Sequence, residues 1–375
     1  MKVLQISKFF PPIRGGIESA AFELAEGLNR HGVPSDVLCA NTAVGSRQDE
    51  MISGYKVVRS GSFGTLLSTS MSPMLMVHAR RMMTAYDVVH VHMPNPMAAL
   101  ALRLSPPRGK LIVHWHSDVI RQRFAQPLYA PLQDWLLQRA DAIVATTPPY
   151  VESSDVLRRW HKKVEIIPLG VSDHSARVDP QAVQAIRDRY AGKRLVFALG
   201  RMTYYKGFDV LIRAARMLPE DCVVLIGGSG RLMSVLGEQV QALNLHGRVH
   251  LLGPLEDGPL LAHFAACDVF CLPSTARAEA FGIAMIEAMA MEKPVVSADI
   301  PGSGVSWINR AGVSGLTVPV GNAQALADGL RRILADPGLQ RRFGLAARNC
   351  YLQRFTADHM VGRVINLYQR VAGAH

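Results

Sequence analysis

Short apolar runs of strand length alternate with segments of helix length along almost the whole chain, and this pattern occurs in two series. Such alternation is typical of βαβ units, in which helices cover the faces of a parallel sheet. A chain of 375 residues also exceeds the size at which a single hydrophobic core stops growing. The sequence therefore predicts an α/β protein with two doubly wound sheets joined by right-handed crossovers.

These runs also predict the strands and the domain boundaries. A turn-rich segment, 168–175, separates the two series and is the predicted linker. We therefore expect an N-terminal domain over 1–172, a C-terminal domain over 173–355 and a final helix within 356–375. The apolar runs are 3–7, 36–40, 56–59, 88–92, 111–114, 142–146 and 164–168 in the first series, and 195–199, 223–226, 249–252, 269–272, 294–298 and 316–318 in the second.

An acidic segment lies where one strand of the second series gives way to a helix. Glu279 and Glu287 flank Phe281, Gly282 and Ile283, and the helical pattern begins near Gly282. The first turn of a helix has unpaired N–H groups and a partial positive charge that suit a phosphate, and glycine permits close approach. Carboxylates accept the hydrogen bonds that sugar hydroxyls donate. The segment fits a sugar nucleotide, although such glutamates also occur as caps and surface groups.

A basic segment lies upstream, in the loop after the strand 195–199. The strand leads into Gly200 and Arg201, and Lys206 follows five positions later. In open α/β sheets, ligands bind outside the carboxyl ends of the strands. A guanidinium fork and an ammonium group suit a pyrophosphate there, whereas either residue alone is typical of a solvated loop. The two segments together predict a site for a nucleoside diphosphate sugar.

With two further motifs, the chain resembles the retaining family 4 glycosyltransferases of the GT-B fold over nearly its whole length. Segment 11–18, Pro-Pro-Ile-Arg-Gly-Gly-Ile-Glu, is similar to the N-terminal Gly-Gly loop of that family. Segment 114–118, His-Trp-His-Ser-Asp, is similar to its histidine loop, which would place His116 over the donor sugar. Segments 204–207 and 302–309 look like the mannosyltransferase-like branch. The resemblance implies two Rossmann-like domains facing each other across a cleft, with the final helix crossing back to the first domain.

The same resemblance implies roles for individual residues. Gly16 would place its N–H on the donor diphosphate, which Arg201 and Lys206 would neutralise. Glu279 would bind hydroxyls of the transferred sugar, and Glu287 would bind the nucleoside ribose. The first domain would bind the acceptor and the second the donor. The implied catalytic residues are His116, Arg201, Lys206 and Glu279, and the implied donor-binding residues are Gly15, Gly16, Gly200, Gly228, Phe281, Gly282, Ile283 and Glu287.

Two other patterns have alternative interpretations. The glycine-rich segment 227–230 lacks the spacing and the acidic residue of a nicotinamide dinucleotide site, so a supporting donor-binding loop is preferred. His90 and His92 alternate along one strand and could bind a metal with His114 and His116, although such histidines are more often hydrogen-bonded core groups. The chain has no Asp-x-Asp motif, the usual metal-diphosphate anchor of the other major glycosyltransferase fold. We therefore expect no metal and no cofactor.

Charge and composition indicate which kinds of partner the chain could bind. The formal net charge is +11 and is split almost evenly between the halves. The stretch 71–123 is both methionine-rich and basic, which suits an anionic membrane face, although a core-facing methionine stripe with solvated arginines is an equal alternative. No recognised nucleic-acid motif accompanies the charge. Because the chain lacks an apolar run of about 18 residues, a secretory signal and metal-spaced cysteines, we expect a cytoplasmic protein with reduced thiols.

The sequence thus predicts a metal-independent retaining hexosyltransferase of surface polysaccharide synthesis, such as that of lipopolysaccharide. Its donor is expected to be a GDP-sugar carrying mannose or a deoxymannose, with a UDP-sugar as the alternative. The expected acceptor is a hydroxyl of a lipid-linked glycan precursor, which implies peripheral contact with the inner face of the cytoplasmic membrane. Two alternatives stay open: a glycoside hydrolase with Glu279 and Glu287 as paired carboxylates, and a non-catalytic sugar-nucleotide-binding protein.

Overall fold

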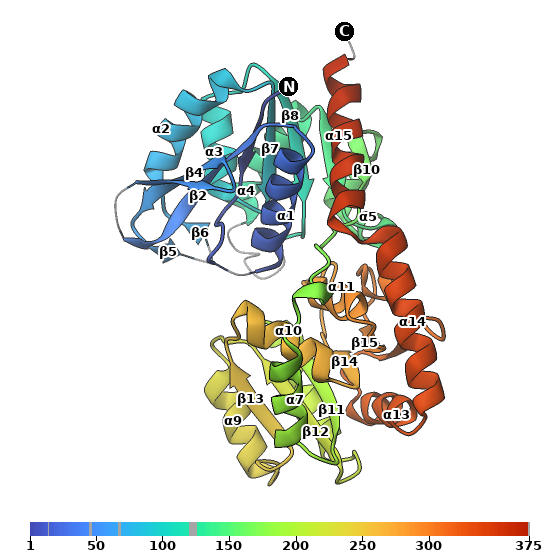
Figure 1. Ribbon diagram of the computed structural model, residues 1–375. Helices are drawn as coiled ribbons and strands as arrows, with labels where there is room; N and C mark the ends of the chain where they lie inside the picture. Colours follow the sequence, from blue (N-terminus) through green and yellow to red (C-terminus); the bar gives the residue numbers. More distant parts are fainter. Residues whose placement is uncertain (14, 45–46, 67–68, 120–125, 374–375) are drawn as a thin grey trace. The chain divides into compact units, whose positions relative to one another are not determined.

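The computed structural model of the chain describes residues 1–13, 15–44, 47–66, 69–119 and 126–373 (Figure 1). The chain divides into two compact units: unit 1 comprises Met1–Gly170 with Ala357–His375, and unit 2 comprises Val171–Thr356. The bounds expected from the sequence differ from these by one or two residues. Arg14 of the glycine-loop motif, and Arg121 and Arg123 of the basic stretch, lie outside the described residues.

Unit 1 is built on an eight-stranded sheet. Neighbouring strands are parallel except at one edge, where β3 runs antiparallel to β4. Two short strands, β5 (Thr65–Leu66) and β6 (Thr69–Ser70), pair separately. In their order across the sheet, the strands are β10 (Val164–Ile166), β9 (Ala142–Ala145), β8 (Lys110–Trp115), β7 (Val88–Met93), β1 (Val3–Ile6), β2 (Ser35–Val44), β4 (Tyr55–Ser62) and β3 (Gln48–Ile52).

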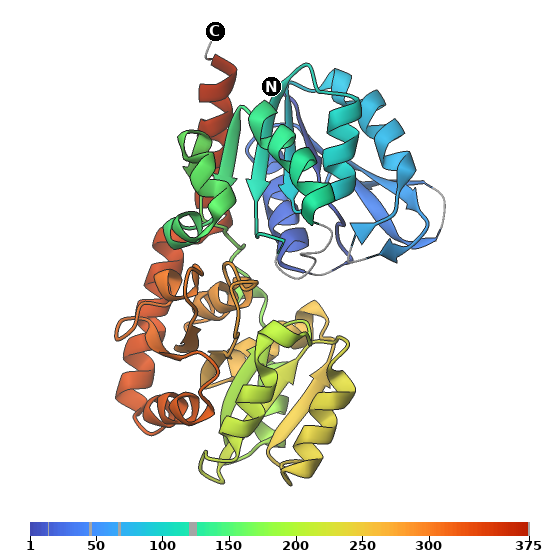
Figure 2. The same ribbon diagram turned by 180° about the vertical axis from the view of Figure 1, so that it is seen from behind.

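Helices cover both faces of this sheet. Helix α1 is in front in Figure 1, whereas the opposite view in Figure 2 brings α3 and α4 to the front. The last helix, α15, packs against α1, and Gly27 permits this, because a Cβ there would lie 2.3 Å from Val361 Cγ2. The helices are α1 (Gly16–Arg30), α2 (Pro73–Met82), α3 (Pro96–Leu104), α4 (Gln126–Arg139), α5 (Pro148–Ser153), α6 (Asp155–Arg159) and α15 (Ala357–Gly373), with 3-10 turns η1 (Met83–Ala85) and η3 (His161–Lys163).

Unit 2 is built on a six-stranded sheet in which all neighbouring strands are parallel. In sheet order the strands are β13 (Val249–Gly253), β12 (Cys222–Gly227), β11 (Arg194–Leu199), β14 (Val269–Leu272), β15 (Val295–Asp299) and β16 (Gly315–Pro319). The helices are α7 (Pro180–Arg189), α8 (Phe208–Ala215), α9 (Met233–Ala242), α10 (Asp257–Ala266), α11 (Ile283–Ala290), α12 (Val305–Ile308), α13 (Ala323–Leu334) and α14 (Pro337–Arg354), with 3-10 turns η4 (Ser175–Arg177) and η5 (Tyr204–Lys206).

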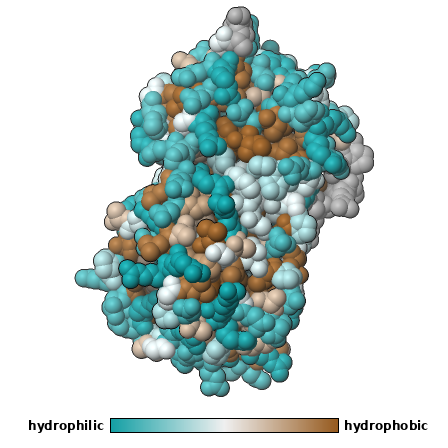
Figure 3. Space-filling view, turned by 90° about the vertical axis from the view of Figure 1, so that its right-hand side faces the viewer, coloured by the Kyte–Doolittle hydropathy of each residue, from teal (hydrophilic) through white to brown (hydrophobic). Residues whose placement is uncertain are grey.

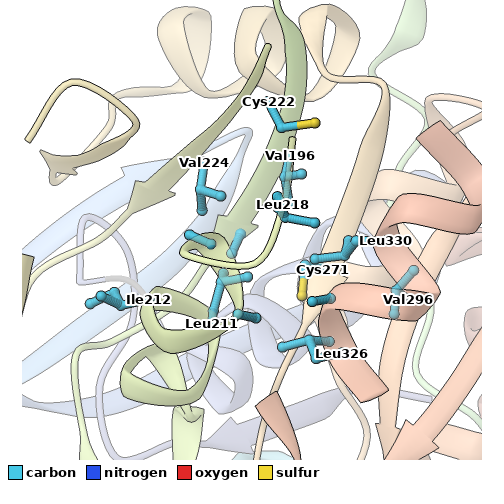
Figure 4. Close-up of a cluster of buried hydrophobic side chains, with 14 of the residues drawn as sticks. Val196, Leu211, Ile212, Leu218, Cys222, Val224, Cys271, Val296, Leu326 and Leu330 are labelled. Carbon is cyan, nitrogen blue, oxygen red and sulfur yellow. The ribbon is translucent and has the colours of Figure 1, made fainter. Parts of the chain in front are cut away.

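The core of unit 2 has a layer on each side of the sheet. Figure 4 shows one layer, in which Val196 of β11 lies among side chains of α8 and α13 such as Leu211 and Leu330. Phe197, the next residue of β11, packs edge-on against Phe264 of α10 at 5.1 Å between ring centroids. Adjacent residues of a strand point to opposite faces. A near-continuous apolar strand is therefore buried on both sides, as expected for a parallel sheet.

The fold confirms the predicted α/β class with two Rossmann-like sheets. Each predicted apolar run overlaps one strand of the two large sheets, whereas β3, β5 and β6 were not predicted. The five cysteines are free, and all but Cys350 are buried. Among the described residues, no helix combines the length and the apolar character needed to cross a bilayer. On the face drawn in Figure 3, apolar side chains form separate patches among hydrophilic ones.

Candidate functional site

Each sheet has a point where the order of its strands reverses. In unit 2 the chain passes from β11 to β12 on one side and later returns to β14 on the other side of β11. In unit 1 the corresponding neighbours are β1 and β7. Loops at the carboxyl ends of such strands diverge and leave a crevice where ligands bind. The basic and acidic segments follow β11 and β14, so the fold brings them to this point of unit 2.

The basic segment is a short loop that bends back over the end of β11. Lys206 ends η5, and a Cβ on Gly200 would lie 2.9 Å from Lys206 Cε, so the lysine side chain lies against the glycine. Gly207 has φ 66°, and a Cβ there would lie 2.0 Å from the Pro273 carbonyl oxygen. Only glycine combines this conformation with so close an approach to the neighbouring loop. Arg201 is exposed and, in the described part of the chain, forms no ion pair.

Glu279 and Lys206 form an ion pair between the two loops. Lys206 Nζ donates to Glu279 Oε2 at 2.7 Å, and Ser274 Oγ donates to the same oxygen at 2.8 Å. The two side chains are only 12% and 9% exposed. Burial lowers the pKa of Lys206, but the Glu279 carboxylate outweighs it, so the pKa lies above its usual value. Within the described residues, Glu279 Oε1 accepts no hydrogen bond, so this oxygen is available to a ligand.

The acidic segment then enters a helix, as predicted. Gly282 adopts the left-handed conformation, with φ 88°, and caps α11, which begins at Ile283. Phe281 is buried and packs edge-on against Phe355, with ring centroids 6.0 Å apart. Glu287 is half-buried one turn after Ile283, and residues four apart share one side of a helix. The first N–H groups of α11 are thus presented beside the ion pair.

The glycine-rich loop after β12 supports the basic segment. Gly228 has φ 119°, and a Cβ there would lie 2.0 Å from the Gly200 carbonyl oxygen. The Met202 N–H donates to the Ser229 carbonyl at 2.8 Å. Because these contacts are made by the backbone, the loop can pack on the basic segment only with glycine at 228.

In unit 1 the glycine loop follows β1, at the reversal point of that sheet. Gly15 precedes α1 and Gly16 is its first residue. A Cβ on Gly15 would lie 2.3 Å from Glu18 Oε2. Upstream, the buried guanidinium of Arg59 donates to the Phe10 carbonyl at 3.2 Å and also to the Pro11 carbonyl. Arg59, which the sequence did not single out, thus ties the start of this loop to β4.

His116 follows the end of β8, two strands from β1. The loop after it is held by Asp118, which accepts hydrogen bonds from Trp115 Nε1 and Ser154 Oγ, both at 2.9 Å. The Asp118 N–H donates to Tyr150 at 2.7 Å. His116 is 6% exposed. It stands at the same carboxyl edge of the sheet as the glycine loop.

His116 belongs to a cluster of four buried imidazoles on β7 and β8, in which the rings of His92, His114 and His116 are stacked and that of His90 is tilted. Nitrogen atoms of His90, His92 and His114 lie within 4.8 Å of one another, close enough to be considered as metal ligands. However, the His92 and His114 rings are stacked, with 23° between their planes. An imidazole binds a metal along a nitrogen lone pair, which lies in the ring plane. Hydrogen-bond distances also join these rings, such as 3.2 Å between His90 Nε2 and His114 Nδ1.

Comparison with known proteins agrees with this geometry. Residues 181–350 match the family model described as "Glycosyl transferases group 1", and residues 15–170 match the "Glycosyl transferase 4-like domain". The chain is 32% identical over 375 residues to the O-antigen chain mannosyltransferase C of Escherichia coli, covering 98% of each chain. It is 34% identical over 361 residues to the D-rhamnosyltransferase WbpZ of Pseudomonas aeruginosa, covering 95% of this chain and 93% of the relative.

Solved structures share the fold over the whole chain. The sucrose-phosphate synthase of Thermosynechococcus elongatus has a TM-score of 0.81 at 23% identity and covers 100% of both chains. HepE of Anabaena, in complex with UDP and glucose, has a TM-score of 0.79 at 21% identity and covers 99% of this chain and 100% of that one. The full-length relatives above 30% identity and the two matched family models show that the chain is a glycosyltransferase of family 4, with the GT-B fold.

Proposed function

We propose that the chain is a retaining hexosyltransferase that moves a sugar from a nucleoside diphosphate to a hydroxyl of a lipid-linked glycan in surface polysaccharide synthesis. The observation that carries this proposal is the Lys206–Glu279 ion pair at the reversal point of unit 2, 2.7 Å long and beside the start of α11. The pair holds Lys206, a cation that can bind the diphosphate, next to Glu279, a carboxylate that can accept hydrogen bonds from the sugar.

The proposed mechanism follows from where charge develops. As the bond from the sugar to the diphosphate breaks, negative charge grows on the leaving phosphate and positive charge on the sugar. The negative charge on the leaving phosphate is stabilised by Lys206, Arg201 and the N–H groups of α11. Glu279 accepts hydrogen bonds from the sugar hydroxyls through Oε1, and its orientation is held by Ser274 and Lys206. The acceptor hydroxyl passes its proton to the leaving phosphate as it attacks the same face of the sugar.

We infer a manno-configured donor, with GDP-mannose or the GDP form of a deoxymannose preferred to a UDP-sugar. The support comes from two relatives, one named a mannosyltransferase and the other a D-rhamnosyltransferase. D-rhamnose is a deoxymannose, so both names point to the same sugar series. Both relatives also align over more than nine-tenths of this chain, which favours a similar task for the whole protein.

A panel of nucleotide sugars tests this function. We expect GDP-mannose to raise the unfolding temperature more than UDP-glucose does, and to release GDP when lipid-linked glycan is added. Binding without GDP release from any acceptor would favour a sugar-nucleotide-binding protein. Hydrolysis of an aryl mannoside without nucleotide, abolished by Glu279→Gln and Glu287→Gln, would favour a glycoside hydrolase. Preference for UDP-sugars would overturn the inferred donor but not the reaction.

We further propose that unit 1 contacts an anionic membrane through a surface centred on α2. The Phe63 N–H donates to the Met71 carbonyl at 2.9 Å, so these two exposed apolar residues are neighbours. One turn along, exposed Met74 and Val77 continue the surface. We call the α2 surface the set Phe63, Met71, Met74, Val77, Arg80 and Arg81, all of which are exposed. Apolar groups with adjacent cations suit the boundary between anionic headgroups and acyl chains.

Two other basic residues of the region, Arg103 and Lys110, have structural partners. Lys110 pairs with Asp141 at 3.7 Å, and Arg103 lies 5.2 Å from the Trp135 ring centre. In the cluster 158–163, Lys163 Nζ donates to the carbonyl of Gln138 near the end of α4 at 2.6 Å and to that of Ala140, just after α4, at 2.9 Å. The methionines also differ in exposure: Met83 is buried, whereas Met71 and Met74 are exposed. These contacts narrow the proposed membrane surface to α2 and the Phe63 turn.

Vesicle sedimentation tests the α2 surface. We expect the protein to bind vesicles of anionic phospholipid at low salt and to lose binding as salt is raised, because exposed charges are screened beyond about 10 Å at 0.1 M. Replacing both Arg80 and Arg81 with Glu should weaken binding, whereas the same charge change at exposed Arg341 and Arg342 of α14 should have a smaller effect. Equal losses for both double variants would leave only non-specific charge attraction, and a soluble acceptor would then be preferred.

A further inference from the structure

The four buried histidines of β7 and β8 form two hydrogen-bonded pairs. His90 and His92 alternate on β7, and His92 is the register partner of His114 on β8. The His92 Nδ1 and His116 Nε2 atoms are 2.9 Å apart, and the His90 Nε2 and His114 Nδ1 atoms are 3.2 Å apart. His114 and His116 are stacked with ring centroids 4.2 Å apart. Each pair also has one outer neighbour, which is Gln5 for the first pair and Tyr368 for the second.

Gln5 sets the direction of the hydrogen bonds in the first pair. Its Oε1 lies 2.7 Å from His92 Nε2, while its Nε2 faces Ser35 Oγ at 3.4 Å. An amide oxygen only accepts, so His92 carries its proton on Nε2 and its Nδ1 is a lone pair. That lone pair accepts from His116, which therefore carries its proton on Nε2. His116 Nδ1 is left as an acceptor.

The acceptor nitrogen of His116 is buried. Within the described part of the chain, His116 Nδ1 is buried without a hydrogen-bond partner. Buried polar atoms of this kind usually have a partner, so an unpaired one needs an explanation, such as a ligand or a water molecule that completes it. Burial lowers the pKa of His116 well below its usual value, and the neighbouring His114 and His92 act in the same direction. The ring is thus neutral, and a neutral acceptor suits a hydroxyl and disfavours a phosphate oxygen.

We propose that Gln5 and His92 are positioning residues that hold His116 in the tautomer protonated on Nε2, so that its Nδ1 accepts a hydrogen bond from a hydroxyl of the donor sugar. The inference rests on the proposed function and on the position over the donor sugar that the family resemblance implies for His116. This role explains why two polar residues, Gln5 of β1 and His92 of β7, are fully buried.

The tautomer can be measured directly in the protein without ligand. In protein labelled with ¹⁵N-histidine, long-range ¹H–¹⁵N spectra distinguish protonated from unprotonated ring nitrogens, and His116→Gln assigns the signals. We expect an unprotonated Nδ1 and a protonated Nε2 for His116 in the wild type. A protonated Nδ1 would overturn the proposal, whatever the protein is later found to transfer.

Two substitutions of Gln5 then separate positioning from packing. Gln5→Glu keeps an acceptor for His92 and should preserve the tautomer, whereas Gln5→Met fills the same space without an acceptor and should give a mixture. Tyr368→Phe, at the outer end of the second pair, is the matched control and should leave the His116 signals unchanged.

Binding gives the functional readout. Gln5→Met should lower the affinity for GDP-mannose relative to that for GDP by at least about tenfold, the scale for losing an orienting outer partner. Gln5→Glu should restore the ratio. Equal losses for both ligands, or an unchanged ratio with a mixed tautomer, would overturn the positioning role. Failure of wild-type protein to bind GDP-mannose would instead contradict the proposed donor, while the tautomer measurement would still decide the assignment made here.

Discussion

Mild acid should selectively destabilise unit 1, because its sheet buries four imidazoles. His90, His92 and His114 are fully buried and His116 is 6% exposed. Burial lowers the pKa of His114 to about 3 and those of His90, His92 and His116 well below 6.5, with neighbouring histidines adding to the effect in these three. The folded unit therefore keeps these rings neutral at a pH where the unfolded chain protonates them. Where the unfolded state binds more protons, the free energy of unfolding decreases as the pH is lowered.

The magnitude follows from the pKa of about 6.5 that histidine has in an unfolded chain. At pH 5.5, protonation of one such histidine stabilises the unfolded state by about 1.4 kcal/mol, and at pH 7.5 by less than about 0.1 kcal/mol. Four rings together remove about 5.5 kcal/mol of unfolding free energy between these pH values. The full contribution is present above pH 6.5 and is lost as the pH falls through that value. Since domains are stable by about 5–15 kcal/mol, this loss amounts to at least about a third of the unfolding free energy of unit 1.

Tryptophan fluorescence can follow unit 1 alone. Three of the four tryptophans lie in unit 1, so in Trp307→Phe protein the signal comes only from that unit. Urea titrations at pH 7.5 and 5.5 give the two unfolding free energies. His114→Asn should reduce the difference by about a quarter, whereas His161→Gln, at an exposed position, should not change it. A difference below about 1.5 kcal/mol in the parent would refute the reasoning, because most of the rings would then accept protons while folded.

Three further predictions concern unit 2. Lys206→Ala should lower sugar transfer by about 100-fold, the scale for losing one preorganised charge stabiliser, while Lys193→Ala at an exposed site should not; steady-state rates decide this. Glu279→Gln should weaken binding of the intact sugar nucleotide more than binding of the free nucleoside diphosphate, and calorimetry showing equal losses would place Glu279 away from the sugar. Gly228→Ala should cost about 2 kcal/mol or more of stability in urea titrations, because its Cβ would meet the Gly200 carbonyl at 2.0 Å; unchanged stability would contradict this contact.

The sequence predicted the strands of both sheets well, and the reason is their burial on both faces. A strand such as β11 is apolar at nearly every position between two polar loops, and a pattern of this kind is visible without knowledge of its partners. Strand β3 was missed because it lies at an edge. Four of its five residues are exposed, and Gln48, Asp49 and Glu50 show no apolar alternation. Its pairing with β4 is a tertiary property that local sequence does not reveal.

In the candidate site, too, some features could be predicted from local sequence and others could not. Gly282 was recognisable because a helical pattern begins after a glycine and follows a strand, and the structure places the helix start there. The Lys206–Glu279 contact was not predictable from local pattern, since the two residues are 73 positions apart and meet only because β11 and β14 are neighbours. Ser274 donates a hydrogen bond to Glu279. The sequence indicated this role only through the position of Ser274, which follows Pro273 at the end of a predicted strand. Gln5 gave no signal, because a single polar residue in a buried strand acquires a partner only in the folded sheet.

Unit 1 begins the chain but is completed by its last helix. His90 hydrogen-bonds to Tyr368 of α15 over a separation of 278 positions, and the ribosome must finish unit 2 before it makes that helix. From Gly170 to residue 375 it adds 205 residues (375 − 170), which takes about 10–40 s at roughly 5–20 residues per second. During this interval the nascent N-terminal half lacks the cover that α15 provides for α1. Unit 2 is continuous in sequence and can fold before unit 1 is complete. Chaperones that bind exposed apolar surface during translation would therefore bind the N-terminal part of unit 1, although it leaves the ribosome first.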